Sequence, residues 1–227
     1  GILTYEDLSG YSSDVGNIMT KTMPEYRGLK YGPGNSGFLV QVLNILKCFD
    51  ISSMDPLSTD FLHLLLETMR HAWTNYFAYP RETGLLTIDY AKEIADLINP
   101  HKSIPKKPLD PSPYQSQKVL KSSFSSRIKP DNTTTIATAD KEGNIVNLLT
   151  SLGNNFGSKV VVPNTGIVLN DHMCNFDPVP GRPLSLGPSR RPPPGAHVPI
   201  FFRDDKACLA IDAPGARRSM SGVLHTI

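Results

Sequence analysis

Residues 132–151 read NTTTIATADKEGNIVNLLTS, two runs of strand-forming residues joined by a polar turn. Polar and apolar side chains alternate in these runs with a period close to two, as in a half-buried strand. Gly143 lies inside the turn, where a hairpin needs backbone freedom. The stretch therefore predicts a β-hairpin, with strands at 133–139 and 145–151.

The hairpin begins with three consecutive threonines, Thr133, Thr134 and Thr135. A cut in front of one of them would give it a free α-amine, which can act as the base for its own hydroxyl. Two plainer explanations stay open on the residues alone. Threonine is common at strand starts, and Asn132-Thr133-Thr134 also matches the acceptor pattern for N-glycosylation.

Before the hairpin, apolar residues recur at helical spacing in three segments. They predict helices at 38–46, 58–73 and 87–98, with Ser58 as the N-cap of the second, and each apolar face is expected to pack in a core. We expect the histidines on or beside these helices to be surface or hydrogen-bonded residues rather than metal ligands. They are His63, His71 and His101.

The composition changes after the third helix. Residues 102–132 are rich in proline, serine and lysine and predict an exposed linker. Beyond the hairpin, short apolar runs predict further strands, a proline-rich stretch at 178–199 interrupts them, and 216–227 is expected to begin a helix. The runs are 160–162, 167–169, 200–202 and 208–211. Helices followed by strands predict an α+β fold or a layered αββα arrangement.

Composition limits the classes of function. The chain has 227 residues, 39% of them hydrophobic and 19% charged, and its formal charge of +2 is spread along its length. These values are ordinary for a globular protein, and a spread charge does not favour a nucleic-acid surface. No stretch reaches the roughly 20 apolar residues of a membrane-spanning helix. We therefore expect neither nucleic-acid binding nor a membrane span in this chain.

Cys48, Cys174 and Cys208 match neither a short metal-ligand spacing nor an even disulfide framework. We expect free thiols, no bound metal and no cofactor, and such thiols favour the cytoplasm. The chain begins at Gly1 without an initiator methionine, and residues 1–8 lack the pattern of a signal peptide. An upstream export signal would place the protein in the periplasm or outside the cell instead.

Five short motifs occur in one order along the second half of the chain. They are Thr133-Thr134-Thr135, Asp140-Lys141-Glu142-Gly143-Asn144, Phe156-Gly157-Ser158-Lys159, Gly166-Ile167-Val168-Leu169-Asn170-Asp171 and Pro214-Gly215-Ala216. Together they resemble the small subunit of the γ-glutamyltranspeptidase family. Residues 1–8, 26–28 and 43–46 are similar to the second half of that family's large subunit. The resemblance covers nearly the whole chain, which corresponds to the middle of a family member.

This resemblance implies the fold of an N-terminal-nucleophile hydrolase, a four-layer αββα sandwich of which the chain forms a part. Residues 1–132 would be the end of the large subunit, with the linker at 102–132. Residues 133–227 would be the catalytic start of the small subunit, intertwined with the first part in one domain. The resemblance also implies that a proenzyme cuts itself between Asn132 and Thr133. The product would be a heterodimer of large and small subunits, or a higher oligomer.

Catalytic roles follow from the resemblance position by position. In the family, the nucleophilic threonine lies seven residues before the aspartate of the turn. Counting back seven residues from Asp140 therefore gives Thr133 as the nucleophile, with its released α-amine as the base. Ser151 matches the family's second hydroxyl. The backbone N–H groups of Gly215 and Ala216 match the oxyanion hole, a role that backbone donors can perform in either residue type.

The chain departs from the family where the γ-glutamyl group is held, at Gly153, His172, Asn175 and Gly195. Asn175 replaces an acidic residue and cannot pair with an ammonium group by charge. We therefore expect an amide hydrolase or acyltransferase that acts on a small amide or γ-glutamyl-like substrate other than ordinary glutathione.

Two alternatives stay open. One is a true γ-glutamyl hydrolase or transferase of glutathione metabolism with a rearranged pocket. The other is a catalytically silent family member that acts as a binding or structural protein. Two departures from the family support the silent member: Thr135 replaces a histidine, and Ala216 replaces a glycine.

Overall fold

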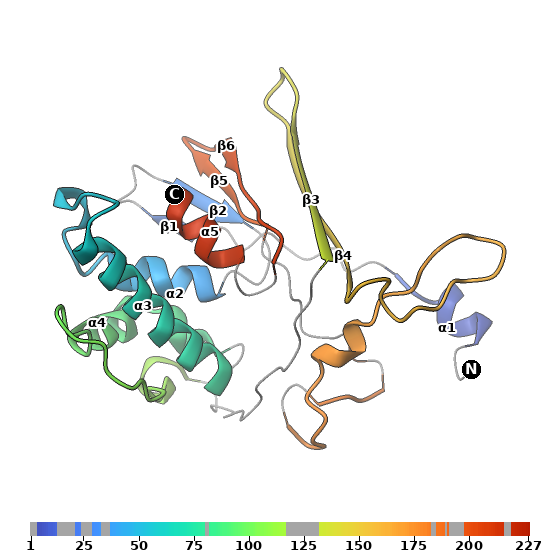
Figure 1. Ribbon diagram of the computed structural model, residues 1–227, viewed down its shortest axis with the longest axis horizontal. Coiled ribbons are helices and arrows are strands. Elements are labelled where there is room, and N and C mark those ends of the chain that lie inside the picture. The colour runs from blue at the N-terminus through green and yellow to red at the C-terminus, as the bar shows by residue number, and fades with distance from the viewer. Residues whose placement is uncertain are drawn as a thin grey trace.

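The computed structural model describes residues 4–12, 21–23, 29–32, 37–79, 82–116, 132–182, 185–188, 190, 198–215 and 219–227. The helices are α1 (Tyr5–Ser9), α2 (Gly37–Leu46), α3 (Thr59–Ala78), α4 (Ile88–Asp96) and α5 (Ser219–Thr226). The strands are β1 (Lys21–Met23), β2 (Leu29–Gly32), β3 (Asn132–Ala139), β4 (Ile145–Gly153), β5 (Ile200–Arg203) and β6 (Lys206–Ala210). Figure 1 shows α2, α3 and α4 grouped together, with the β3–β4 hairpin standing apart from them.

The three helices predicted before the hairpin are confirmed as α2, α3 and α4. Side chains cap two of them: Ser58 Oγ accepts a hydrogen bond from Phe61 N at 3.2 Å, and Thr87 Oγ1 accepts one from Tyr90 N at 3.3 Å. Such caps satisfy backbone N–H groups that have no partner in the first helical turn. The predicted N-cap at Ser58 is therefore confirmed.

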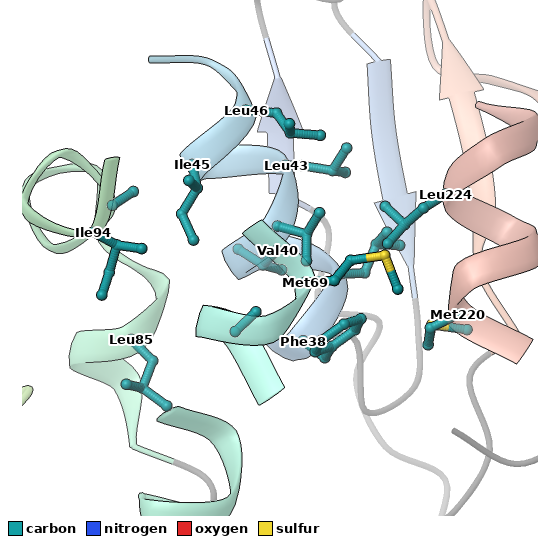
Figure 2. Close-up of a cluster of buried hydrophobic side chains, with 14 of the residues drawn as sticks. Phe38, Val40, Leu43, Ile45, Leu46, Met69, Leu85, Ile94, Met220 and Leu224 are labelled. Atoms are coloured by element: carbon teal, nitrogen blue, oxygen red, sulfur yellow. The ribbon is translucent and has the colours of Figure 1, made fainter. Parts of the chain in front are cut away.

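Helix α2 is the centre of the hydrophobic core. Every residue of α2 from Phe38 to Leu46 is buried. Figure 2 shows side chains of α3, α4 and α5 around it, including Met69, Ile94 and Leu224. A helix that is apolar and buried on all sides is stable only when other elements pack around it, as α3, α4 and α5 do here. The rings of Phe38 and Trp73 stack with centroids 4.0 Å apart and so join α2 to α3.

The described strands form two separate antiparallel sheets. One has the order β1-β2-β5-β6, in which Gly32 pairs with Ile200 and brings together distant parts of the sequence. The sequence patterns missed α1, β1 and β2, because segments of three to five residues are too short to show a period. The other sheet is the predicted hairpin, with Thr133 opposite Ser151.

Two strand predictions after the hairpin were wrong. The runs 160–162 and 167–169 are both described, and they meet only at one isolated bridge, between Val161 and Val168. Nearby, Asn164 and Gly166 have φ of 63° and 71°, and left-handed backbone of this kind bends the chain away from an extended strand.

The other predictions for this half differ little from the structure. β5 matches the run at 200–202, and β6 begins at Lys206 rather than 208. The predicted C-terminal helix is α5. The mixed helix-and-sheet class is confirmed, and the four-layer sandwich stays a prediction for the whole protein.

The described part of the predicted linker, 102–116, is attached to the helices rather than fully exposed. Leu109 N donates a hydrogen bond to Asn75 Oδ1 at 3.0 Å, and Tyr90 Oη donates one to Leu109 O at 2.9 Å. The Lys106 side chain is 3% exposed. Prolines prevented a regular element here, but they did not prevent side-chain and backbone hydrogen bonds with α3 and α4.

Glu67 of α3 is the main polar anchor of that segment. Its carboxylate, 2% exposed, accepts hydrogen bonds from Arg70 Nη1 and Ser103 Oγ, each at 2.7 Å, and from Lys106 Nζ. Burial raises the pKa of Glu67, but hydrogen bonds from Lys106, Ser103 and Arg70 together outweigh burial and lower the pKa to about 2. The carboxylate is therefore ionised at neutral pH inside the fold.

His71, on the same helix, is also buried, with 3% of the residue exposed and neither ring nitrogen hydrogen-bonded to a described residue. Burial, and next the positive charge of Lys106, lower its pKa from 6.5 to about 4. Between pH 6.5 and about 4, His71 of the unfolded chain binds a proton, while His71 of the folded chain does not. The resulting stabilisation is complete above pH 6.5 and is lost as the pH falls through about 4.

Replacing His71 by glutamine is expected to remove that pH dependence. Through this group the wild-type protein should lose about 3 kcal/mol of unfolding free energy between neutral pH and pH ~4. Urea denaturation at a series of pH values measures the slope. His63→Gln is the matched control, because His63 Nε2 lies near the surface, 2.8 Å from Asn99 O. A wild-type slope in His71→Gln would contradict the prediction.

Candidate active site

Strands β3 and β4 bring two hydroxyl side chains together. Antiparallel pairing sets Thr133 opposite Ser151, so both side chains leave the hairpin on the same face. Thr133 Oγ1 donates a hydrogen bond to Ser151 Oγ at 3.3 Å. Both residues are half-buried, whereas Thr134 and Thr150 on the opposite face are exposed. The pairing therefore gives Thr133 surroundings that its neighbour Thr134 does not share.

The backbone is irregular beside this pair. Ser151 Oγ also accepts a hydrogen bond from Gly153 N at 3.0 Å, and Gly153 has a φ of 89°. The pairing register shifts between Asn132 and Thr133, because Asn132 is opposite Gly153 and Leu152 is skipped. Such a bulge re-aims side chains and is common next to active sites. The predicted cleavage peptide thus lies at the irregular end of the hairpin.

The other end of the hairpin is a tight polar turn. Asp140 Oδ1 accepts a hydrogen bond from Asn144 N at 2.8 Å, and Asp140 Oδ2 accepts one from Asn144 Nδ2 at 2.7 Å. The hydrogen bonds from the Asn144 side chain and backbone lower the pKa of Asp140. Gly143, with a φ of 87°, closes the turn. This turn helps to fix the register that places Thr133 opposite Ser151.

Gly215, one of the two predicted oxyanion residues, lies half-buried in the segment after β6 and has a φ of 119°. Asn147, on the same face of β4 as Ser151, connects this region to the hairpin. Its Nδ2 donates hydrogen bonds to the backbone carbonyls of Pro199 and Ile211, each at 3.2 Å. Ala216 lies outside the described residues, so the oxyanion hole stays a prediction.

Three of the four predicted substrate-binding residues lie close together. A Cβ built on Gly153 would be 3.2 Å from His172 Cδ2. A short 3-10 helix, His172–Asn175, carries His172 and Asn175 at its two ends. Gly195 lies outside the described residues. The structure therefore brings Gly153 and His172 into contact range beside Ser151 and places Asn175 one turn farther on.

Cys174, in the same short helix, is exposed and free. Burial, and next the negative charge of Asp171, raise the pKa of its thiol above the usual 9.0. The thiol is therefore protonated at neutral pH and is a poor nucleophile. The hydroxyl pair is the better candidate for covalent chemistry at this site.

Asp171 is a site residue that the sequence reasoning missed. Its Oδ1 lies 1.8 Å from the position that a Cβ on Gly153 would occupy. The sequence itself offers only a glycine at 153 and an acid at 171. Neither residue alone indicates that the two touch.

In the described part of the chain, no three His, Cys, Asp or Glu side chains gather as a metal site. Among the same residues, no helix has both the length and the apolarity needed to cross a bilayer.

Comparison with known proteins agrees with the motifs. The family model described as Gamma-glutamyltranspeptidase matches residues 1–227. A glutathione hydrolase proenzyme of Bacillus subtilis (strain 168) is 33% identical over 241 residues, which cover 100% of this chain and 41% of that protein. The Acylase ACY 1 proenzyme of Pseudomonas sp. (strain SE83) is 28% identical over 232 residues, with 100% and 40% covered. The crystal structure of cephalosporin acylase from Bacillus halodurans superposes with a TM-score of 0.77 at 25% identity, covering 99% of this chain and 39% of that one.

These relatives are hydrolases and acylases, and the solved acylase shares the mixed helix-and-sheet fold of this chain. The chain belongs to the gamma-glutamyltranspeptidase family. It spans about two fifths of the length of the relatives it matches, 41% and 40% for the two proenzymes.

Proposed function

We propose that this chain is part of an amide hydrolase or acyltransferase that cuts itself between Asn132 and Thr133 and uses Thr133 as its nucleophile. The observation that supports this most is the 3.3 Å hydrogen bond from Thr133 Oγ1 to Ser151 Oγ. Among the three consecutive threonines, Thr133 is the one opposite that serine. The match of two relatives named as proenzymes is consistent with a cut.

In the proposed cut, Thr133 Oγ1 attacks the carbonyl carbon of Asn132. An ester bond forms as the C–N bond to Thr133 breaks, and the hydroxyl proton ends on the released nitrogen. Water then hydrolyses the ester, which restores the hydroxyl and leaves a carboxylate on Asn132. The register shift at this peptide supports the location, since the backbone there is not held in a regular ladder.

After the cut, the α-amine of Thr133 is the base for the hydroxyl. Its reference pKa of about 7.7–8.0 leaves a useful neutral fraction near neutral pH, while the uncut amide nitrogen cannot accept a proton. Ser151 orients the hydroxyl through their hydrogen bond. Thr133 attacks the amide carbonyl of the substrate, the amine leaves with a proton, and water or another amine takes the acyl group. The N–H groups of Gly215 and Ala216 stabilise the oxyanion.

The proposed substrate is a small amide other than ordinary glutathione. Gly153 offers no side-chain hydrogen bond, and Asn175 carries no charge. Relatives named as acylases match this chain over almost its whole length, which supports a different acyl group. The second candidate, a γ-glutamyl hydrolase or transferase with a rearranged pocket, is favoured by the 33% identity to a glutathione hydrolase proenzyme.

The proposal extends to the whole protein. Residues 1–132 end the large subunit and 133–227 start the small one, the two remain together as a heterodimer, and the full chain completes an αββα sandwich. A cytoplasmic location belongs to the proposal on the strength of three widely spaced cysteines.

Intact-mass analysis of the purified full-length protein tests the central claim. The expected result is two chains whose masses place the break after Asn132, with N-terminal sequencing of the smaller chain beginning at Thr133. Release of an anilide chromophore from acyl anilides should rise in step with the cut. A single uncut species after long incubation would reject autoprocessing. A fully cut protein that reacts with no electrophilic amino-acid analogue at Thr133 would favour the silent family member.

A further inference from the structure

The carboxylate of Asp171 occupies the place that a side chain at residue 153 would fill. A Cβ on Gly153 would lie 1.8 Å from Asp171 Oδ1, so a side chain at 153 would displace the Asp171 carboxylate. Asp171 N donates a hydrogen bond to Leu152 O at 3.0 Å. The side chain is held as well, because Asp171 Oδ1 accepts a hydrogen bond from Asn154 N at 3.2 Å and Oδ2 accepts one from Asn154 Nδ2 at 2.5 Å.

Gly153 connects the Asp171 carboxylate to the hydroxyl pair. The amide of Gly153 donates to Ser151 Oγ at 3.0 Å, and Ser151 Oγ accepts from Thr133 Oγ1 at 3.3 Å. One residue, Gly153, therefore touches both the hydroxyl pair and the Asp171 carboxylate.

The charge of Asp171 is not neutralised by any described side chain. Its hydrogen-bond donors are uncharged amides of Asn154, and no described lysine, arginine or histidine forms an ion pair with it. It is half-buried, so a cation brought to it would be attracted more strongly than in open water. Asn175, at the far end of the following short helix, supplies no charge of its own.

We propose that Asp171 binds a cationic amine on the acyl part of the substrate, beside the carbonyl that Thr133 attacks. The substrate class is then an amide whose acyl chain carries an ammonium group, and an α-carboxylate on that chain is not required. This inference rests on the proposed function of Thr133. It assigns the contact with the amine to Asp171, because position 175 carries the uncharged Asn175 in place of the family's acid.

Three p-nitroanilides with the same leaving group and similar chain length separate the possibilities. The 4-aminobutyryl anilide carries only an ammonium, the glutaryl anilide only a carboxylate, and the butyryl anilide neither. With fully cut wild-type protein, kcat/KM should be highest for the 4-aminobutyryl anilide. Asp171→Asn should lower that value roughly 10- to 100-fold, mainly through KM, and change the butyryl anilide less than about 3-fold.

Glu142→Gln is the matched control. It removes the same charge from the exposed turn at the far end of the hairpin and should leave the ranking of the three anilides unchanged. Asparagine at 171 keeps Oδ1 as the acceptor for Asn154 N but loses Oδ2, the acceptor for Asn154 Nδ2. Circular dichroism therefore checks that the variant keeps its fold. A loss by the same factor for all three anilides would overturn the specificity role.

A binding measurement separates this inference from the proposed function. Calorimetric titration with 4-aminobutyrate, an acyl product that needs no turnover, should show saturable binding to wild-type protein and at least 10-fold weaker binding to Asp171→Asn, with butyrate binding to neither. An uncut or inactive protein that still shows this difference would reject the proposed reaction and keep the amine site. A fully cut, active protein that binds 4-aminobutyrate and butyrate alike would reject the amine site alone.

Discussion

Replacing Thr133 by alanine is expected to leave the full-length protein as one uncut chain without amide-hydrolysing activity. In the proposed mechanism the Thr133 hydroxyl attacks both the Asn132 carbonyl and the substrate, so both reactions would lose their nucleophile. Losses on removing a nucleophile are typically about 10³-fold or more in kcat. Intact mass after long incubation measures the first effect, and chromophore release from an acyl anilide measures the second.

Two further variants make this result specific. Thr134→Ala changes the adjacent threonine, which is exposed on the other face of the hairpin, and should be cut and active like the wild type. Thr133→Ser keeps a hydroxyl and should still be cut, more slowly. If Thr133→Ala were cut between residues 132 and 133 as fast as wild type, the nucleophile would lie elsewhere.

Replacing Glu67 by glutamine is expected to destabilise the fold by about 3–5 kcal/mol at neutral pH, as breaking a buried ion pair typically does. The reason is Lys106, whose side chain is 3% exposed and would be left without its counter-charge. Urea denaturation of wild type and variant gives the difference. A change below about 1 kcal/mol would show that the contacts of Glu67 with Lys106, Ser103 and Arg70 contribute little.

The pH dependence provides a second, independent readout. The Glu67 pKa is lowered from 4.5 to about 2 in the fold, so its stabilisation is complete above pH 4.5 and is lost as the pH falls towards 2. Glu67→Gln should lack this acid loss. Asp89→Asn is the matched control, because Asp89 forms its 3.0 Å ion pair with Lys92 on the exposed surface and should leave stability almost unchanged.

The elements that the sequence predicted well are those with long, regular patterns. The apolar spacing in α2, α3 and α4 and the alternation in β3 and β4 reflect local geometry, so they can be recognised without the fold. β1 and β2 have three and four residues, and they become strands only by pairing with each other and with β5. Such long-range pairing has no local signal.

The candidate site also contains residues that the sequence predicted and one that it missed. Thr133 and Ser151 were predicted from motif order, and the strand pairing places them opposite each other. Asp171 was missed because its position over Gly153 depends on a return of the chain from residue 154 to 171, across backbone with φ of 61° at Phe156 and 53° at Gly157. A side chain that fills a space left by another residue cannot be recognised from either residue alone.

Thr133 and Thr134 have the same side chain, so residue type alone does not distinguish them. Strand pairing makes the distinction instead, since a slip of β3 by one residue would set Thr134 opposite Ser151 and turn Thr133 to the exposed face. The hydrogen bonds of Asp140 with Asn144, at the far end of the strands, thus help to select which threonine meets the serine. The position of the proposed nucleophile therefore depends partly on a turn at the opposite end of the hairpin.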